Sequence, residues 1–117
     1  MKKARTKGSQ GEREFAKILC EKFGVDYART PLSGGLDIKG DIRRKYGSKS
    51  SRADDFHWEI KRQESLNIHK ALSQAISDSS FKIPVVAFRR NKGNWFCCLV
   101  ADDFLNIVKE LEDLSNE

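Results

Sequence analysis

Two carboxylates and a lysine are the residues of this 117-residue sequence that best combine reactive type and useful spacing. Glu59 and Lys61 lie two positions apart in an alternating stretch, so both side chains should leave a strand on the same face. Asp41 lies on the polar face of the alternating stretch 36–43, and a hairpin would bring it beside them. Asp37 shares that face and is the alternative to Asp41.

This set of residues is suited to metal-assisted hydrolysis of a phosphodiester. Carboxylate oxygens are the ligands that Mg²⁺ and Mn²⁺ prefer, and such ions keep waters that a substrate can replace. The ion polarises a phosphate and lowers the pKa of the attacking water. A lysine can stabilise the charge that develops on the phosphate oxygens. Carboxylates this close would repel one another without a cation between them.

The hydrophobic pattern predicts the elements that must position these residues. Ser9 is the expected N-cap of a first helix that stops at Gly24. We expect helices at 9–23, at about 67–79 and from Asp102 or Asp103, and strands at 25–29, 36–43, 55–62, 83–88 and 95–100. The order αβββαββα predicts an α/β fold (an α+β sandwich), with a small mixed sheet of about five strands flanked by about three helices. The strands at 36–43 and 55–62 should be antiparallel neighbours.

Length and composition limit the chain to one domain. Residues 1–8 contain four bases and no acid, and we interpret them as a mobile basic arm before a single domain at 9–117. The apolar runs are too short to span a bilayer, and no apolar segment follows the basic start as in a secretory signal. The three cysteines have no spacing typical of zinc ligands, so reduced thiols in the cytoplasm are expected.

Charge is distributed unevenly along the chain. Residues 102–117 hold one base and six acids, a net charge of −5, whereas residues 1–101 hold 21 bases and 11 acids, a net charge of +10. Phosphate contacts dominate nucleic-acid affinity, so a small basic body indicates a polyanionic partner. The stretch 43–52 is especially basic, and we interpret it as a loop that grips DNA and orders on binding.

Four segments together resemble one nuclease superfamily. These are KGSQGERE at 7–14, ARTPLSGG at 28–35, Asp41 in GDI, and EIK at 59–61. The pattern resembles PD-(D/E)xK nucleases, in particular the archaeal-type Holliday junction resolvases and their phage-encoded relatives. The resemblance implies a restriction-endonuclease-like core and a homodimer that cleaves four-way DNA junctions by paired nicks. It implies Mg²⁺, for which Mn²⁺ may substitute, and no small-molecule cofactor or membrane. The expected location is the cytoplasm, or the host cytoplasm for a phage protein.

The resemblance assigns roles by position. The catalytic residues that it implies are Glu12, Ser33, Asp41, Glu59, Lys61 and Gln74. The metal ligands that it implies are Asp41, Glu59, Glu12 and the backbone carbonyl of Ile60. The bases that we expect to contact DNA are Lys7, Arg13, Arg29, Arg43, Arg44, Lys45, Lys49, Arg52 and Arg62.

Several alternatives stay open at this point. Gly40 stands before Asp41 where the family pattern has proline, and the stretch from Asp41 to Glu59 is longer than expected. Glu12 could serve only as a helix-capping acid, and Gln74 could be a solvated position. His57 shares the Glu59 face, where we expect it at the surface or against the substrate. The alternative functions are another nuclease of the superfamily, acting on duplex DNA by nicking or restriction-like cleavage, and a non-catalytic DNA-binding module.

Overall fold

The structure is a computed structural model, which describes residues 2–30 and 41–116, with the backbone alone for residues 2–7. Its helices and strands follow in the predicted order, αβββαββα. The elements are α1 (Lys2–Phe23), β1 (Tyr27–Arg29), β2 (Ile42–Arg44), a 3₁₀ helix η1 (Arg52–Asp55), β3 (Phe56–Arg62), α2 (Ile68–Asp78), β4 (Ile83–Arg89), β5 (Phe96–Cys98) and α3 (Ala101–Ser115).

Helix α1 is longer than its sequence pattern indicated. It begins at Lys2, so residues 2–8, which we expected to form a mobile arm, are helical. Ser9 is therefore not an N-cap; its Oγ instead accepts a hydrogen bond from Nη2 of Arg29 at 3.1 Å. The helix ends as predicted at Gly24, whose φ of 64° favours glycine and whose N–H donates to the carbonyl of Cys20.

The five described strands form two sheets instead of the single mixed sheet that we expected. β1 pairs with β2 in antiparallel fashion, and β3, β4 and β5 form the second sheet, with β3 and β4 parallel. No regular ladder joins β2 to β3 among the described residues, although the N–H of Asp41 donates to the carbonyl of Trp58. The predicted antiparallel pairing of 36–43 with 55–62 is therefore absent at 42–43 and stays a prediction for 36–40. Residues 31–40 lie outside the described part of the chain.

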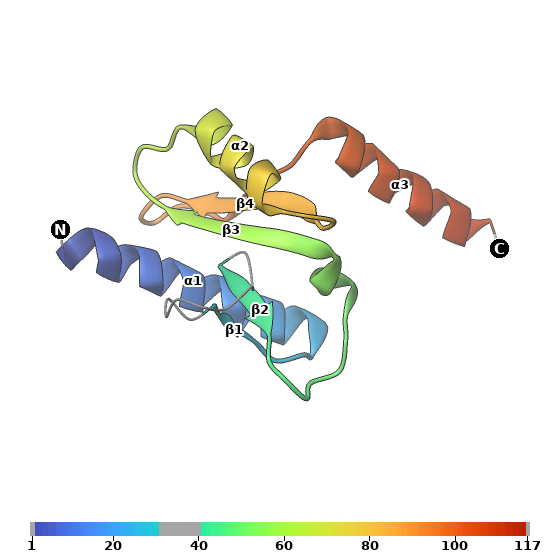
Figure 1. The fold of residues 1–117 in the computed structure, drawn as a ribbon, viewed down its shortest axis with the longest axis horizontal. Coiled ribbons are helices and arrows are strands. Elements are labelled where there is room, and N and C mark those ends of the chain that lie inside the picture. Colours follow the sequence, from blue (N-terminus) through green and yellow to red (C-terminus); the bar gives the residue numbers. More distant parts are fainter. Residues whose placement is uncertain (1, 31–40, 117) are drawn as a thin grey trace.

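Helices cover both faces of the second sheet (Figure 1). α1 and the β1–β2 hairpin lie on one face, and α2 lies on the other. Phe15, Leu19 and Ile60 belong to the core on the α1 side, whereas Ala75 and Val86 belong to a smaller core under α2. β4 contributes to both cores, because Ala87 joins the first. Burial on both faces explains its unbroken apolar sequence.

Strand β3 directs its two faces to these two layers. Ile60 is buried against α1 and Trp58 packs on the same core. Glu59 and Lys61, at the intervening positions, leave the strand on the α2 side. His57 shares that face and is only 3% exposed, so the expectation of a surface histidine is wrong. It is buried because the sheet has helices on both sides.

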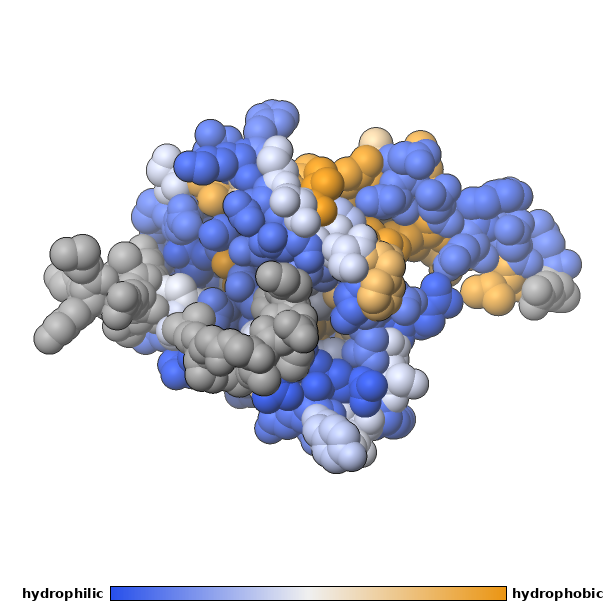
Figure 2. Space-filling model, in the orientation of Figure 1, coloured by the Kyte–Doolittle hydropathy of each residue, from blue (hydrophilic) through white to orange (hydrophobic). Residues whose placement is uncertain are grey.

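Helix α3 stands apart from these layers and extends away from the body (Figure 1). Among its described residues none is buried, although Phe104, Leu105, Val108, Leu111 and Leu114 are large and apolar. Orange surface gathers between α2 and α3 and along α3, while most of the rest of this view is blue (Figure 2). No helix in the described part of the chain is both long and apolar enough to cross a membrane.

Candidate active site

Asp41 ties the small sheet to the free edge of β3. Its backbone N–H donates to the carbonyl of Trp58 at 2.9 Å, and its own carbonyl accepts from the N–H of Thr30 at 2.8 Å. Its side-chain Oδ2 accepts from the N–H of Ile60 at 2.6 Å. These hydrogen bonds hold Asp41 directly beside β3, the strand that carries Glu59 and Lys61, although no regular ladder joins β2 to β3.

The electrostatics of Asp41 place two more carboxylates and a lysine near it. Burial of the carboxyl, together with the negative charges of Glu59 and Glu12, raises the pKa of Asp41 from 3.8 to about 7. The hydrogen bond from Ile60 and the positive charge of Lys61 act in the opposite direction. Four residues that we predicted for the site therefore lie close enough to influence one another electrostatically: Glu12 of α1, Asp41 before β2, and Glu59 and Lys61 of β3.

Among the described residues, Glu12 is held by a hydrogen bond from a neighbouring side chain, whereas Glu59 is not. Oε2 of Glu59 lies 3.6 Å from Nε2 of His57, a distance longer than a hydrogen bond. Nε2 of His57 is buried with no hydrogen-bond partner among the described atoms. Oε2 of Glu12 accepts from Nε of Arg29 at 2.8 Å. Arg29, which we had expected to contact DNA, therefore stabilises a carboxylate of the candidate site.

The donor set suits a hard divalent cation. Asp41, Glu59 and Glu12 offer carboxylate oxygens, and their mutual repulsion is what a cation would relieve. The carbonyl of Ile60 leaves β3 on the same side as its N–H, which points to Asp41, so it too faces this edge. Among the described residues, no three His, Cys, Asp or Glu side chains are grouped so as to hold an ion as they stand.

The predicted DNA-binding bases divide into ion-paired and unpaired groups. Four of these arginines are ion-paired: Arg29 with Glu12, and Arg44 with Asp54. Arg52 pairs with both Asp55 and Glu110, and Arg62 pairs with Glu14. Arg13, Lys45 and Lys49 are exposed and form no ion pair with a described residue. Nε of Arg43 is buried and lacks a described partner. Exposed bases without a protein partner are the ones best placed to meet phosphate.

Glu14 is a charged residue whose contacts the sequence did not reveal. It pairs with Arg62 at 3.0 Å and with Arg89 at 2.8 Å, joining α1 to β3 and β4. Arg62 also donates to Oε1 of Gln10 at 3.1 Å. The available signal was its position in the KGSQGERE segment. These contacts give Arg62 a structural role beside the site.

Four of the predicted residues contribute less to this picture. Gln74 is exposed on α2, where its Nε2 donates to Oδ2 of Asp78 at 2.8 Å. Ser33 and Asp37 lie outside the described residues, and for Lys7 the structure describes only the helical backbone.

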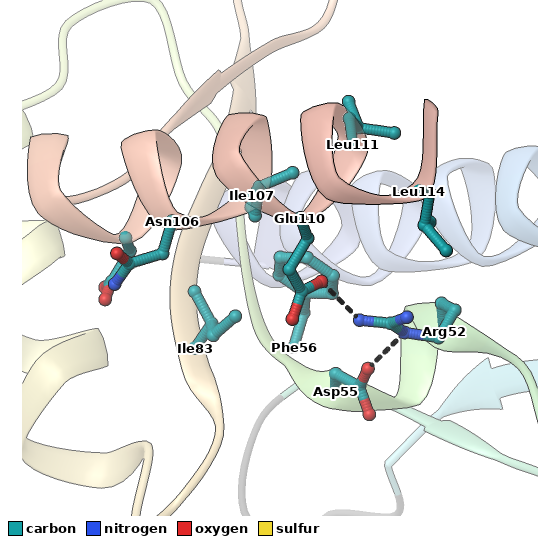
Figure 3. A pocket seen from close by; sticks show the side chains of 10 residues that line it. Arg52, Asp55, Phe56, Ile83, Asn106, Ile107, Glu110, Leu111 and Leu114 are labelled. Carbon is teal, nitrogen blue, oxygen red and sulfur yellow. Dashed lines mark hydrogen bonds and ion pairs between the residues drawn. The ribbon is translucent and has the colours of Figure 1, made fainter. Parts of the chain in front are cut away.

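Arg52 lies on another side of the molecule, under α3 (Figure 3). It pairs with Glu110 of α3 at 2.9 Å and with Asp55 at 2.8 Å. A hollow of about 420 Å³ lies beside these pairs, and its apolar lining includes Ile83 and Leu111. Arg52 therefore connects α3 to the body.

Comparison with known families identifies the chain. Residues 3–116 match the family described as "Phage putative PDDEXK endonuclease". The match covers nearly the whole chain, so the protein belongs to this family of phage PD-(D/E)xK endonucleases. The searches of curated proteins and of solved structures found no match.

Proposed function

We propose that this protein is a Mg²⁺-dependent DNA endonuclease that resolves four-way junctions as a homodimer, with Mn²⁺ able to replace Mg²⁺. The observation that carries the proposal is the attachment of Asp41 to the strand that bears Glu59 and Lys61: its N–H donates to the carbonyl of Trp58, and its Oδ2 accepts from the N–H of Ile60 at 2.6 Å. The raised pKa of Asp41, caused by burial and by the charges of Glu59 and Glu12, agrees with this arrangement. The membership of a PD-(D/E)xK endonuclease family supports the same chemistry. The junction itself is inferred from the sequence resemblance.

In this proposal each residue of the site has a defined task. The ion would be held by Asp41 and Glu59, together with Glu12 and the carbonyl of Ile60. When bound, such an ion polarises the phosphate and activates a water. The N–H of Ile60 orients the Asp41 carboxylate. Lys61 would position the attacking water and stabilise negative charge on the phosphate. Arg13, Lys45 and Lys49 would hold the DNA backbone.

The dimer is supported by the apolar face of α3. Five large apolar side chains of this helix are between 44% and 61% exposed, which is costly for a helix that has no partner. A stable dimer buries about 800 Å² per partner. The apolar side of α3 and the hollow beneath it, which is lined in part by Ile83 and Leu111, are the surface that such a contact would cover. We take a second copy as the occupant, because the acidic segment 102–117 complements the basic body of another molecule.

The decisive experiment measures cleavage of a labelled four-way junction and of linear duplexes with the same arm sequences, in Mg²⁺, in Mn²⁺ and in EDTA. We expect metal-dependent paired nicks in the junction. Asp41→Asn and Glu59→Gln should each lower the rate by at least about a thousandfold, because they remove charge at the ion. Glu21→Gln, an exposed carboxylate on α1, is the matched control and should cleave like the wild type.

The other outcomes contradict the proposal in distinguishable ways. Equal cleavage of duplex and junction would indicate a nicking or restriction-like nuclease. Binding of DNA without cleavage in either metal would indicate a non-catalytic module. Wild-type rates in Asp41→Asn would show that the site lies elsewhere.

A further inference from the structure

The turn that follows β2 presents an aromatic side chain entirely to solvent. Tyr46 is 103% exposed, so no described protein atom covers its ring. The turn around it is well defined: the N–H of Ser48 donates to the carbonyl of Lys45 at 3.2 Å, and Gly47 has a φ of 87°. Positive φ at the third position of a turn is typical of a type II turn with glycine there. Tyr46 therefore occupies its projecting second position.

The body holds this turn at several points. The N–H of Lys45 donates to the carbonyl of Asp26 at 2.8 Å, and Oγ of Ser48 donates to the carbonyl of Lys45 at 2.7 Å. Nε of Arg44 donates to Oδ2 of Asp54 at 2.8 Å, and its Nη1 donates to the carbonyl of Ser48. A ring held in water on an anchored support is already arranged to receive a partner, with little conformational entropy left to lose.

The surroundings of Tyr46 select the chemistry of that partner. Tyr46 is one of the residues that line a hollow of about 690 Å³, whose lining contains four bases and no acid. These bases are Arg43, Lys45, Lys82 and Arg44, the last of which also pairs with Asp54. A basic surface with an aromatic ring is the combination that binds the phosphates of a nucleic acid and stacks on one of its bases. Within a continuous duplex both faces of every base are already stacked, so the ring needs a base at a branch or in a single strand.

The position of the turn connects this feature to the candidate active site. β2 runs directly from Asp41 to the turn, and Lys45 lies about 13 Å from Asp41 along extended chain. Resting on the nuclease function proposed above, we propose that Tyr46 stacks on the unstacked face of a base at a DNA branch point whose backbone lies over the basic hollow. This stacking makes the protein select branched DNA over continuous duplex.

The test measures binding in EDTA, so it does not depend on cleavage. The probe is a four-way junction with 2-aminopurine at the branch point, compared with a duplex of the same sequence. Wild type and Tyr46→Phe should bind the junction more tightly than the duplex and change the 2-aminopurine fluorescence. Tyr46→Ala should lose about fivefold to a hundredfold in junction affinity, lose the fluorescence change and keep its duplex affinity.

Lys49→Ala is the control for charge, because Lys49 is exposed in the same loop. It should weaken binding to junction and duplex alike. Full junction preference in Tyr46→Ala, or equal binding of junction and duplex by the wild type, would overturn the proposal. If the wild type binds junctions through Tyr46 but never cleaves DNA in Mg²⁺, the nuclease function is wrong while the stacking role stands.

Discussion

At the scale of single residues, Asp41 is the clearest sign of chemistry in this protein. A buried carboxyl with two acidic neighbours has no structural advantage, because each neighbour raises the cost of ionising it. Such an arrangement becomes favourable when a cation occupies the site.

Asp41 should make the stability of the metal-free protein depend on pH. Its pKa is about 7 in the folded state and 3.8 ordinarily, so the folded state holds its proton over a range in which the unfolded chain has lost it. The free energy of unfolding should therefore fall as pH rises from about 4 to about 7. Asp41→Asn should lack this pH dependence, and at pH 8 its free energy of unfolding should exceed that of the wild type by about 2–4 kcal/mol.

Urea unfolding of both proteins in EDTA at several pH values measures this difference. Added Mg²⁺ should stabilise the wild type at pH 8 more than the variant, since the ion replaces the missing proton. Parallel pH profiles for the two proteins would contradict the electrostatic account of the site.

The ion pairs of single residues also distinguish paired from unpaired bases, which the sequence alone could not do. Arg44 and Arg52 lie in the same basic stretch as Lys45 and Lys49, yet the arginines are paired with acids. Asp54 and Asp55 follow that stretch in the sequence, but the acid on α3 that reaches Arg52 is 58 residues away. Local charge patterns do not reveal such a partner.

At the scale of elements, the packing of α1 against β3 positions Glu12 opposite the strand that carries Glu59. Gly11 makes this close contact possible: a Cβ at position 11 would lie 2.9 Å from Cβ of Arg62 and 3.8 Å from Cγ2 of Ile60. The first distance is too short for carbon atoms, so any larger residue must push the helix and strand apart.

Gly11→Ala should therefore destabilise the protein by about 1–3 kcal/mol and slow DNA cleavage. Gly8→Ala is the matched control, because the same helix leaves open space there and alanine is the better helix former. That variant should gain up to about 1 kcal/mol. Thermal and urea unfolding of the two variants give the comparison, and equal effects of the two substitutions would contradict the close approach of α1 to β3.

At the scale of the whole molecule, α3 is the feature that the fold of one chain leaves unsatisfied. Its apolar side chains lie over a hollow shared with Phe56 and Ile83 of the body, but none of its described residues is buried. The Arg52–Glu110 ion pair also joins it to the body. An amphipathic helix with an uncovered apolar stripe normally packs against something.

The proposed dimer gives a direct prediction for this helix. Leu111→Glu should convert a dimer into a monomer, because it places a charge on the apolar face. Lys109→Glu places a glutamate on the polar face, where it replaces a base that pairs with Glu112 and Asp113, and should keep the dimer. Light scattering coupled to gel filtration measures the mass of each protein. A monomeric wild type at micromolar concentration would contradict this interface.

From the sequence by itself we could predict which residues are candidates for the site, and in what order the helices and strands follow one another. Alternation and helical spacing are local properties, because each side chain's polarity decides which face of its own element it occupies. The αβββαββα order and the grouping of Glu59 with Lys61 on one face followed from that rule.

Only the tertiary structure decided how those pieces meet. The parallel pairing of β3 with β4, the hydrogen bonds that join Asp41 to β3, the burial of His57 and the exposure of Tyr46 depend on segments far apart in the sequence. Strand partners are chosen by which apolar faces the whole chain can cover at once, and a pKa depends on charges that meet through space. The local spacing of residues therefore predicts neither the strand partners nor the pKa of a buried group.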